Sequence, residues 1–196
     1  MNIVVLVSGG GTNLQAILDA ISNKSITNCN ISAVISSNKD AYALTRAKNF
    51  NLETIVIDRK SYNEPKLYNE ELLKVLTKIN PELIVLAGFM TILDDDIINK
   101  FQNKIINVHP SLIPSFCGKG YYGLFVHKAV LEYGVKITGA TVHYVNNVVD
   151  GGKIILQKAV EVLENDTPQT LQKRVMETAE WEILPKAINL LCNRKD

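Results

Sequence analysis

The first 110 residues alternate short apolar runs, rich in β-branched residues, with segments whose apolar positions follow a helical period. The apolar runs cover residues 2–7, 31–37, 53–58, 82–88 and 104–109, and the helix-patterned segments cover residues 12–21, 41–50, 67–79 and 94–101. The runs at 2–7 and 82–88 are apolar at nearly every position, which is typical of strands that helices cover on both faces. The alternation predicts an α/β fold, a Rossmann-like, mostly parallel sheet flanked by helices on both faces.

After Pro110 the pattern changes. A loop rich in glycine and aromatic residues leads to a predicted helix near Leu124–Glu132. Two alternating strands at 136–145 and 153–162 flank a turn signal and predict a C-terminal antiparallel strand pair. Thr167 and Pro168 suit the N-cap and first position of a long last helix. No linker or repeat interrupts the chain, so residues 1–196 are predicted to form a single domain.

Composition narrows the classes of function. A net charge of +1 with dispersed lysines gives no reason to expect nucleic-acid binding. Cys29, Cys117 and Cys192 are far apart and outside any C-x-x-C spacing, which favours incidental thiols in a reducing compartment over a zinc site. No apolar run approaches the roughly 20 residues that span a bilayer. We therefore predict a cytoplasmic protein that binds no metal, nucleic acid or membrane.

Three glycines, Gly9 to Gly11, separate the first predicted strand from the first helix. A dinucleotide fingerprint would need another glycine at Leu14 and an acidic residue after the second strand, and both are missing. Gly11, Thr12 and Asn13 still offer donors at a helix start, which suits a single phosphate. The alternative is a tight structural turn in which Thr12 caps the helix.

The stretch Asn107-Val108-His109-Pro110 ends the fifth run. Alternation places Asn107 and His109 on one face, and Pro110 cannot continue the strand, so the imidazole lies at its end. Asp150 lies in a turn with two following glycines. If it faces His109, its charge would raise the histidine pKa and tune the ring for proton transfer. The alternative is that His109 and the Asp150 turn are only structural.

Two other histidines occur in the chain. His127 lies in a helical pattern and His143 inside an alternating strand, and neither has a nearby acid in the sequence or a metal-ligand spacing. Both are predicted to be structural.

Five motifs carry a resemblance to a known family. SGGGTNLQAIL, LAGFMTIL, INVHPSLIPSF, VHKAVLEYGVKITGATVHYV and DGGKIILQ occur in this order along almost the whole chain. They resemble the phosphoribosylglycinamide formyltransferase family, which belongs to the folate-dependent formyltransferase superfamily. The N-x-H-P-S-L-x-P stretch with a downstream Asp-Gly is shared by that superfamily, and the glycine loop points to the phosphoribosylglycinamide branch.

The resemblance implies an enzyme that needs no metal and uses 10-formyltetrahydrofolate as co-substrate. Its formyl group would pass to the amine of 5'-phosphoribosylglycinamide, giving formylglycinamide ribonucleotide and tetrahydrofolate in de novo purine (IMP) biosynthesis. Gly11, Thr12 and Asn13 would hold the ribonucleotide phosphate. Asn107 and protonated His109 would stabilise the oxyanion on the formyl carbon, and Asp150 would orient His109 and raise its pKa.

The resemblance also implies contacts away from the reacting atoms. Glu180 would contact the ribonucleotide, and the folate would be bound by Met90, Thr91, Ile92, Leu93, Asn107 and Lys66. Thr91 departs from the family, since many relatives have arginine there, and Lys66 would replace another family arginine. The alternatives are that residues 89–93 pack Phe89, Ile92 and Leu93 into the core, that Lys66 is a charge at a helix start, and that Glu180 lies on a solvated helix face.

Three other functions fit the same motifs less well. A 10-formyltetrahydrofolate hydrolase and the catalytic domain of a methionyl-tRNA formyltransferase each normally carry an added domain, for which 196 residues leave no room. A non-catalytic phosphate sensor would be favoured if Asn107, His109 or Asp150 were missing, and all three are present.

Overall fold

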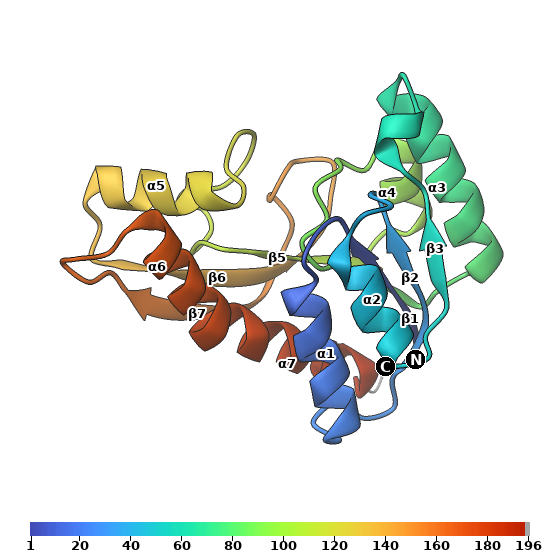
Figure 1. Ribbon diagram of the computed structural model, residues 1–196, viewed down its shortest axis with the longest axis horizontal. Coiled ribbons are helices and arrows are strands. Elements are labelled where there is room, and N and C mark those ends of the chain that lie inside the picture. Colours follow the sequence, from blue (N-terminus) through green and yellow to red (C-terminus); the bar gives the residue numbers. More distant parts are fainter. Residues whose placement is uncertain (195–196) are drawn as a thin grey trace.

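A computed structural model describes residues 1–194 and contains a seven-stranded sheet with the order β3-β2-β1-β4-β5-β6-β7 (Figure 1). The strands are β1 (Asn2–Val7), β2 (Asn30–Ser36), β3 (Thr54–Val56), β4 (Leu83–Leu86), β5 (Ile105–His109), β6 (Ile137–Tyr144) and β7 (Ile154–Glu161). Strands β1 to β5 pair in parallel, whereas β6 pairs antiparallel with both β5 and β7. The mostly parallel sheet and the C-terminal antiparallel pair are confirmed.

Helices follow the strands as the alternation predicts. They are α1 (Thr12–Ser22), α2 (Tyr42–Asn49), α3 (Pro65–Ile79), α4 (Asp95–Lys100), α5 (Leu124–Tyr133), α6 (Pro168–Val175) and α7 (Trp181–Cys192). A 3-10 turn covers Arg59–Ser61, and a π-helical turn, Met176–Glu180, joins α6 to α7. Among the residues described, no helix is long and apolar enough to cross a membrane.

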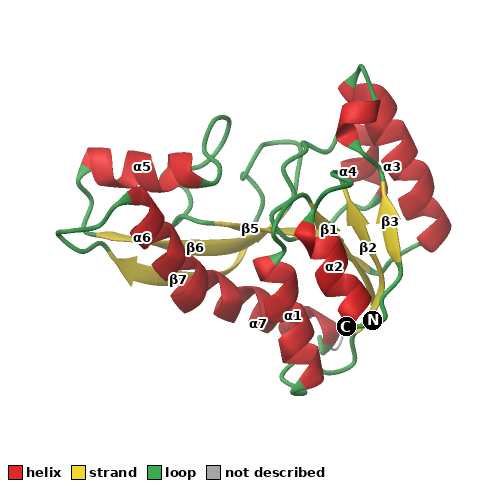
Figure 2. Cartoon of the chain, viewed as in Figure 1, coloured by secondary structure: helices red, strands yellow, loops and turns green. Residues whose placement is uncertain are grey.

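Strand β1 shows why its sequence is apolar throughout. Ile3, Val5 and Val7 face a core formed with α1, α2, α5, α6 and α7, while Val4 and Leu6 face a second core formed with α3 and α4 (Figure 2). All five side chains are fully buried. Because each such side chain contributes about 1.5–3 kcal/mol when buried, a polar residue at any of these positions would be costly.

The last helical segment begins where the sequence predicts. The Thr167 side chain accepts a hydrogen bond from the Thr170 backbone and Pro168 is the first helical residue, so the predicted N-cap is confirmed. The π turn was not predicted; a π turn adds one residue to the helical repeat and often lies at functional sites. It ends at Glu180, whose side chain is buried rather than solvated.

The strand order reverses beside β1, because the chain places β2 on one side of it and β4 on the other. In open α/β sheets, ligands bind at the carboxyl ends of the strands near such a reversal. Neighbouring strands β1, β4 and β5 are followed there by the three loops that the sequence singles out, after Val7, Leu86 and His109.

Candidate active site

The glycine loop has both a structural requirement and unused space. Gly11 is the N-cap of α1 with φ 72°, and a Cβ there would lie 2.6 Å from the Cβ of Ala43. The carbonyls of Gly9 and Gly10 accept hydrogen bonds from the Ala43 backbone and from Arg46 Nε. A Cβ on Gly9 or Gly10 would meet no atom of the described part of the chain within 4 Å. Packing therefore requires glycine at 11, whereas at 9 and 10 the missing side chains leave open space.

Thr12 and Asn13 begin helix α1. Gly11 is its N-cap, and within residues 1–194 no side chain caps this helix, so the alternative in which Thr12 is its cap is wrong. Asn13 is buried, and its Nδ2 donates to Oε2 of Glu180 over 2.7 Å. Burial raises the pKa of Glu180. The structure thus joins two predicted ribonucleotide residues, and the Asn13 side chain is turned toward Glu180.

Ser8 connects the glycine loop to the next loop of the sheet edge. Its hydroxyl lies 2.6 Å from that of Ser37 and accepts a hydrogen bond from the Met90 backbone over 2.9 Å. Sequence reasoning missed this role because a serine at a strand end carries no pattern of its own. The available signal was the position of Ser8 at the strand-order reversal.

The segment Met90–Leu93 presents apolar side chains to solvent. Met90 is 56% and Ile92 67% exposed, whereas Leu93 is buried, so packing into the core is right for Leu93 and wrong for Ile92. Buried Asn69 of α3 supports the segment by donating to the Ile92 carbonyl and accepting from the Asp94 backbone. The exposed apolar edge is thus held by a polar residue that sequence reasoning did not identify.

One further predicted folate residue lies in this segment and another at the start of α3. Thr91 is partly buried within it. Lys66 is the second residue of α3 and is exposed, three positions before Asn69. Lys66 and Asn69 are close along α3, since residues three apart share a helix face.

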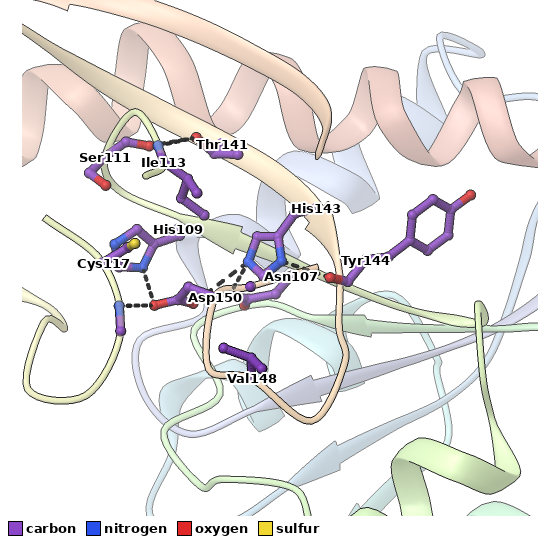
Figure 3. Close-up of polar contacts among 12 residues, drawn as sticks. Asn107, His109, Ser111, Ile113, Cys117, Thr141, His143, Tyr144, Val148 and Asp150 are labelled. Carbon is purple, nitrogen blue, oxygen red and sulfur yellow. Dashed lines mark hydrogen bonds and ion pairs between the residues drawn. The ribbon is translucent and has the colours of Figure 1, made fainter. Parts of the chain in front are cut away.

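Asn107, His109 and Asp150 meet at the end of β5 (Figure 3). Nδ1 of His109 lies 3.5 Å from Oδ2 of Asp150, and Nε2 lies 2.9 Å from the carbonyl oxygen of Phe116. The Gly118 backbone donates to the same Asp150 oxygen over 2.9 Å. The loop after β5 therefore closes over a histidine–carboxylate pair that the sequence had placed 41 residues apart.

Burial decides the pKa of the histidine. Desolvation lowers the pKa of His109 below its usual 6.5, while the Asp150 charge and the Phe116 carbonyl oppose the shift. Asp150 thus acts to raise the pKa of His109 as expected, but burial outweighs it, because the side chain is only 5% exposed. Burial also acts to raise the pKa of Asp150, but its contact with His143, the His109 charge and the hydrogen bond from the Gly118 backbone bring it below its usual 3.8. The carboxylate is ionised at neutral pH.

Backbone geometry at the turn brings Asp150 into place. Asp150 has φ 56°, a left-handed conformation that aspartate tolerates better than most residues. A Cβ on Gly152 would lie 1.7 Å from the carbonyl oxygen of Tyr144, so only glycine allows the turn to approach the end of β6. Asp150 can therefore belong to a structural turn and also face His109.

His143 was predicted to be structural because no acid lies near it in the sequence, but an acid lies beside it in the fold. Its Nε2 lies 3.6 Å from Oδ1 of Asp150. The acid was missed because it arrives from the turn after β6 rather than from a position on the strand face. His127 is fully buried in α5, and burial lowers its pKa to about 4.

The site combines two kinds of chemistry at one sheet edge: an open glycine loop at a helix start, and two hydrogen-bonding side chains beside a buried carboxylate. Among residues 1–194, no cluster of three or more His, Cys, Asp or Glu side chains could hold a metal ion.

Comparison with known proteins places this arrangement in a class. A family model described as formyl transferase matches residues 1–188, so the chain belongs to the formyl transferase family. Within that family, its relatives include proteins named phosphoribosylglycinamide formyltransferase. The Escherichia coli protein of that name is 38% identical over 189 residues, which cover 96% of this chain and 86% of the relative.

A larger relative and a solved structure agree. The trifunctional purine biosynthetic protein adenosine-3 of Gallus gallus is 41% identical over 193 residues, but the chain spans 18% of that protein's length. The crystal structure of glycinamide ribonucleotide transformylase 1 from Symbiobacterium toebii has a TM-score of 0.90 and 40% identity, covering 98% of this chain and 87% of that chain. The predicted family and fold are confirmed.

Proposed function

We propose that this chain transfers the formyl group of 10-formyltetrahydrofolate to the amine of 5'-phosphoribosylglycinamide, giving formylglycinamide ribonucleotide and tetrahydrofolate. The observation that carries the proposal is the meeting of Asn107, His109 and Asp150 at the same sheet edge as the open glycine loop. The names of the relatives support the choice of substrates. A cytoplasmic location stays a prediction from the sequence.

The chemistry follows from the charges of the transition state. Attack of the amine on the formyl carbon places negative charge on the formyl oxygen. Asn107 would supply one N–H donor there, and Nε2–H of a protonated His109 would supply a second once it leaves the Phe116 carbonyl; one preorganised donor is typically worth about 10²–10³ in rate. Both ring contacts of His109, the Asp150 carboxylate and the Phe116 carbonyl, accept hydrogen bonds, so a protonated ring would satisfy both. Asp150 would stabilise that charged ring during proton transfer.

Each substrate has its own part of the edge. The phosphate would lie at the start of α1, where the backbone of Gly9 to Thr12 and the helix dipole favour an anion. Glu180, fixed by Asn13, would bind the ribose. The folate would pack on exposed Met90 and Ile92, with backbone contacts along Met90–Leu93, and Lys66 would supply a cation for it.

The test is a spectrophotometric assay of 10-formyl-dideazafolate deformylation with and without phosphoribosylglycinamide. We expect turnover only when both substrates are present. Turnover without the amine would instead define a hydrolase, and no turnover in either condition would leave a binding protein; each result would overturn the proposal.

A further inference from the structure

His143 contacts two members of the candidate active site at once. Its side chain is 2% exposed, and its Nε2 lies 3.3 Å from Nδ2 of Asn107 and 3.6 Å from Oδ1 of Asp150 (Figure 3). The other ring nitrogen, Nδ1, lies 2.8 Å from the carbonyl oxygen of Tyr144. Three polar contacts, from Asn107, Asp150 and Tyr144, thus converge on one imidazole.

Strand pairing places the ring there. Asn107 of β5 and His143 of β6 are directly opposite in the antiparallel ladder, so their side chains share a face. On its other side β6 pairs with β7, and the register shifts between Val142 and His143. Such an irregularity re-aims a side chain and is common beside active sites.

Hydrogen-bond chemistry then fixes which nitrogen carries the proton. A backbone carbonyl can only accept, so Nδ1 of His143 must be the N–H donor to Tyr144. In the neutral ring this leaves a lone pair on Nε2, which accepts from the Asn107 amide. The amide of Asn107 is therefore held with Nδ2 toward His143, and its second N–H is free for the site.

We propose that His143 is a positioning residue that fixes the amide orientation of Asn107, so that Asn107 presents an N–H to the formyl oxygen. The hydrogen bond from Nδ1 to the Tyr144 carbonyl favours this ring orientation and so keeps Nε2 toward the amide. This inference rests on the proposed function, because Asn107 acts on the formyl oxygen only in that reaction.

Two substitutions of His143 distinguish a role as hydrogen-bond acceptor for Asn107 from a role in packing. The amide of glutamine reaches the place of Nε2, so His143→Gln keeps an acceptor for Asn107, whereas the shorter His143→Asn keeps only the contact at Nδ1. We expect His143→Asn to lower kcat about tenfold to 100-fold while the KM of each substrate changes less than about threefold. His143→Gln should recover most of kcat. Equal losses in both variants would overturn the proposal.

A double-mutant cycle tests whether His143 affects kcat through Asn107. If His143 acts through Asn107, adding His143→Asn to Asn107→Ala should lower kcat by less than about twofold further. A full additional loss would contradict the proposal. Thr138→Val is the matched control, because Thr138 is also buried on β6 and, within the described residues, its hydroxyl has no hydrogen-bond partner. This control should leave kcat unchanged.

Nuclear magnetic resonance gives a readout that does not depend on activity. Long-range ¹H–¹⁵N spectra of the free protein should show the neutral His143 ring protonated at Nδ1 and not at Nε2. The opposite tautomer would overturn the proposal even if the enzyme is active. Conversely, an Nδ1–H ring in a protein without formyl transfer would mean that the proposed function, rather than the His143 geometry, has failed.

Discussion

At the scale of single residues, the glycines of the loop differ in what they are needed for: one is required by the fold, and another only borders the proposed ligand. Gly11 has a left-handed backbone and its missing Cβ makes room for Ala43, so a valine there would disturb the free protein. Gly10 has neither constraint. Substitution at Gly10 therefore reports on the ligand alone.

We expect Gly10→Ala to raise the KM for phosphoribosylglycinamide about tenfold, because its methyl group would occupy the space proposed for the phosphate. The KM for the formyl folate should stay within experimental error, and the Tm should not fall. Steady-state kinetics with each substrate varied in turn, together with thermal unfolding, would check this. Equal rises in both KM values would mean that the loop only shapes the fold.

Asp150 is the second residue whose effect can be measured separately. Its charge opposes the burial of His109, so removing the charge should lower the pKa of His109 further. Asp150→Asn should reduce kcat by roughly 10²-fold, and the limb of the pH–rate profile set by His109 should move to lower pH. The measurement is kcat at half-unit pH steps. A profile of unchanged shape would remove Asp150 from the proton transfer.

At the scale of elements, the π turn between α6 and α7 turns Glu180 inward onto Asn13 of α1. The spacing of apolar residues could not predict the inward position of Glu180. A π turn adds one residue to the helical repeat, which changes the side chains that face the core, while the sequence of apolar residues stays the same. The N-cap of α6, in contrast, was readable from Thr167 and Pro168. Local chemistry at helix ends is visible in sequence, whereas a local change of helical repeat is not.

Replacing Glu180 tests whether its side chain is buried as a charge and contacts the ribonucleotide. Because burial raises its pKa above the unfolded value, folding is favoured most at low pH, and this advantage is lost as the pH rises through the folded pKa. Glu180→Gln removes the buried charge, so the Tm at pH 7 should rise, while the KM for phosphoribosylglycinamide should increase about tenfold. Glu182→Gln, on the partly exposed start of α7, is the control for KM. An unchanged KM in Glu180→Gln would exclude its contact with the ribonucleotide.

Along the strands, the sequence predicted those features that depend only on the residues of a single strand. The fully apolar run of β1 required two covering layers, and the pair Asn107 and His109 required only alternation. The surroundings of His143 could not be predicted, because its partners come from β5 and from the turn after β6 and so depend on strand pairing. The supporting role of Asn69 could not be predicted either, because the loop it contacts belongs to another part of the chain.

At the scale of the whole molecule, two cores share one sheet, so a buried polar group in either affects the stability of the entire chain. His127 is such a group: burial lowers its pKa from 6.5 to about 4. Between these values the unfolded chain binds the additional proton, so the protein loses stability as the pH falls from about 6.5 to about 4.

A non-titrating residue should remove this dependence. His127→Leu should reduce the loss of unfolding free energy between pH 7 and pH 4 by roughly 3 kcal/mol, from about 1.36 kcal/mol per pKa unit. Urea unfolding of both proteins across this range would check it. Parallel stability curves for the two proteins would contradict the assignment of this pH dependence to His127.

The open space at Gly9 and Gly10 has a consequence for engineering. Replacing a glycine by alanine where the backbone tolerates it stabilises a protein by about 0.4–1 kcal/mol, because the unfolded chain loses freedom. A redesign guided only by thermal stability would choose these two glycines early, since nothing in the free protein resists the change. On the proposed function, it would yield a more stable protein whose phosphate site is blocked, and a screen for folding would not detect the loss.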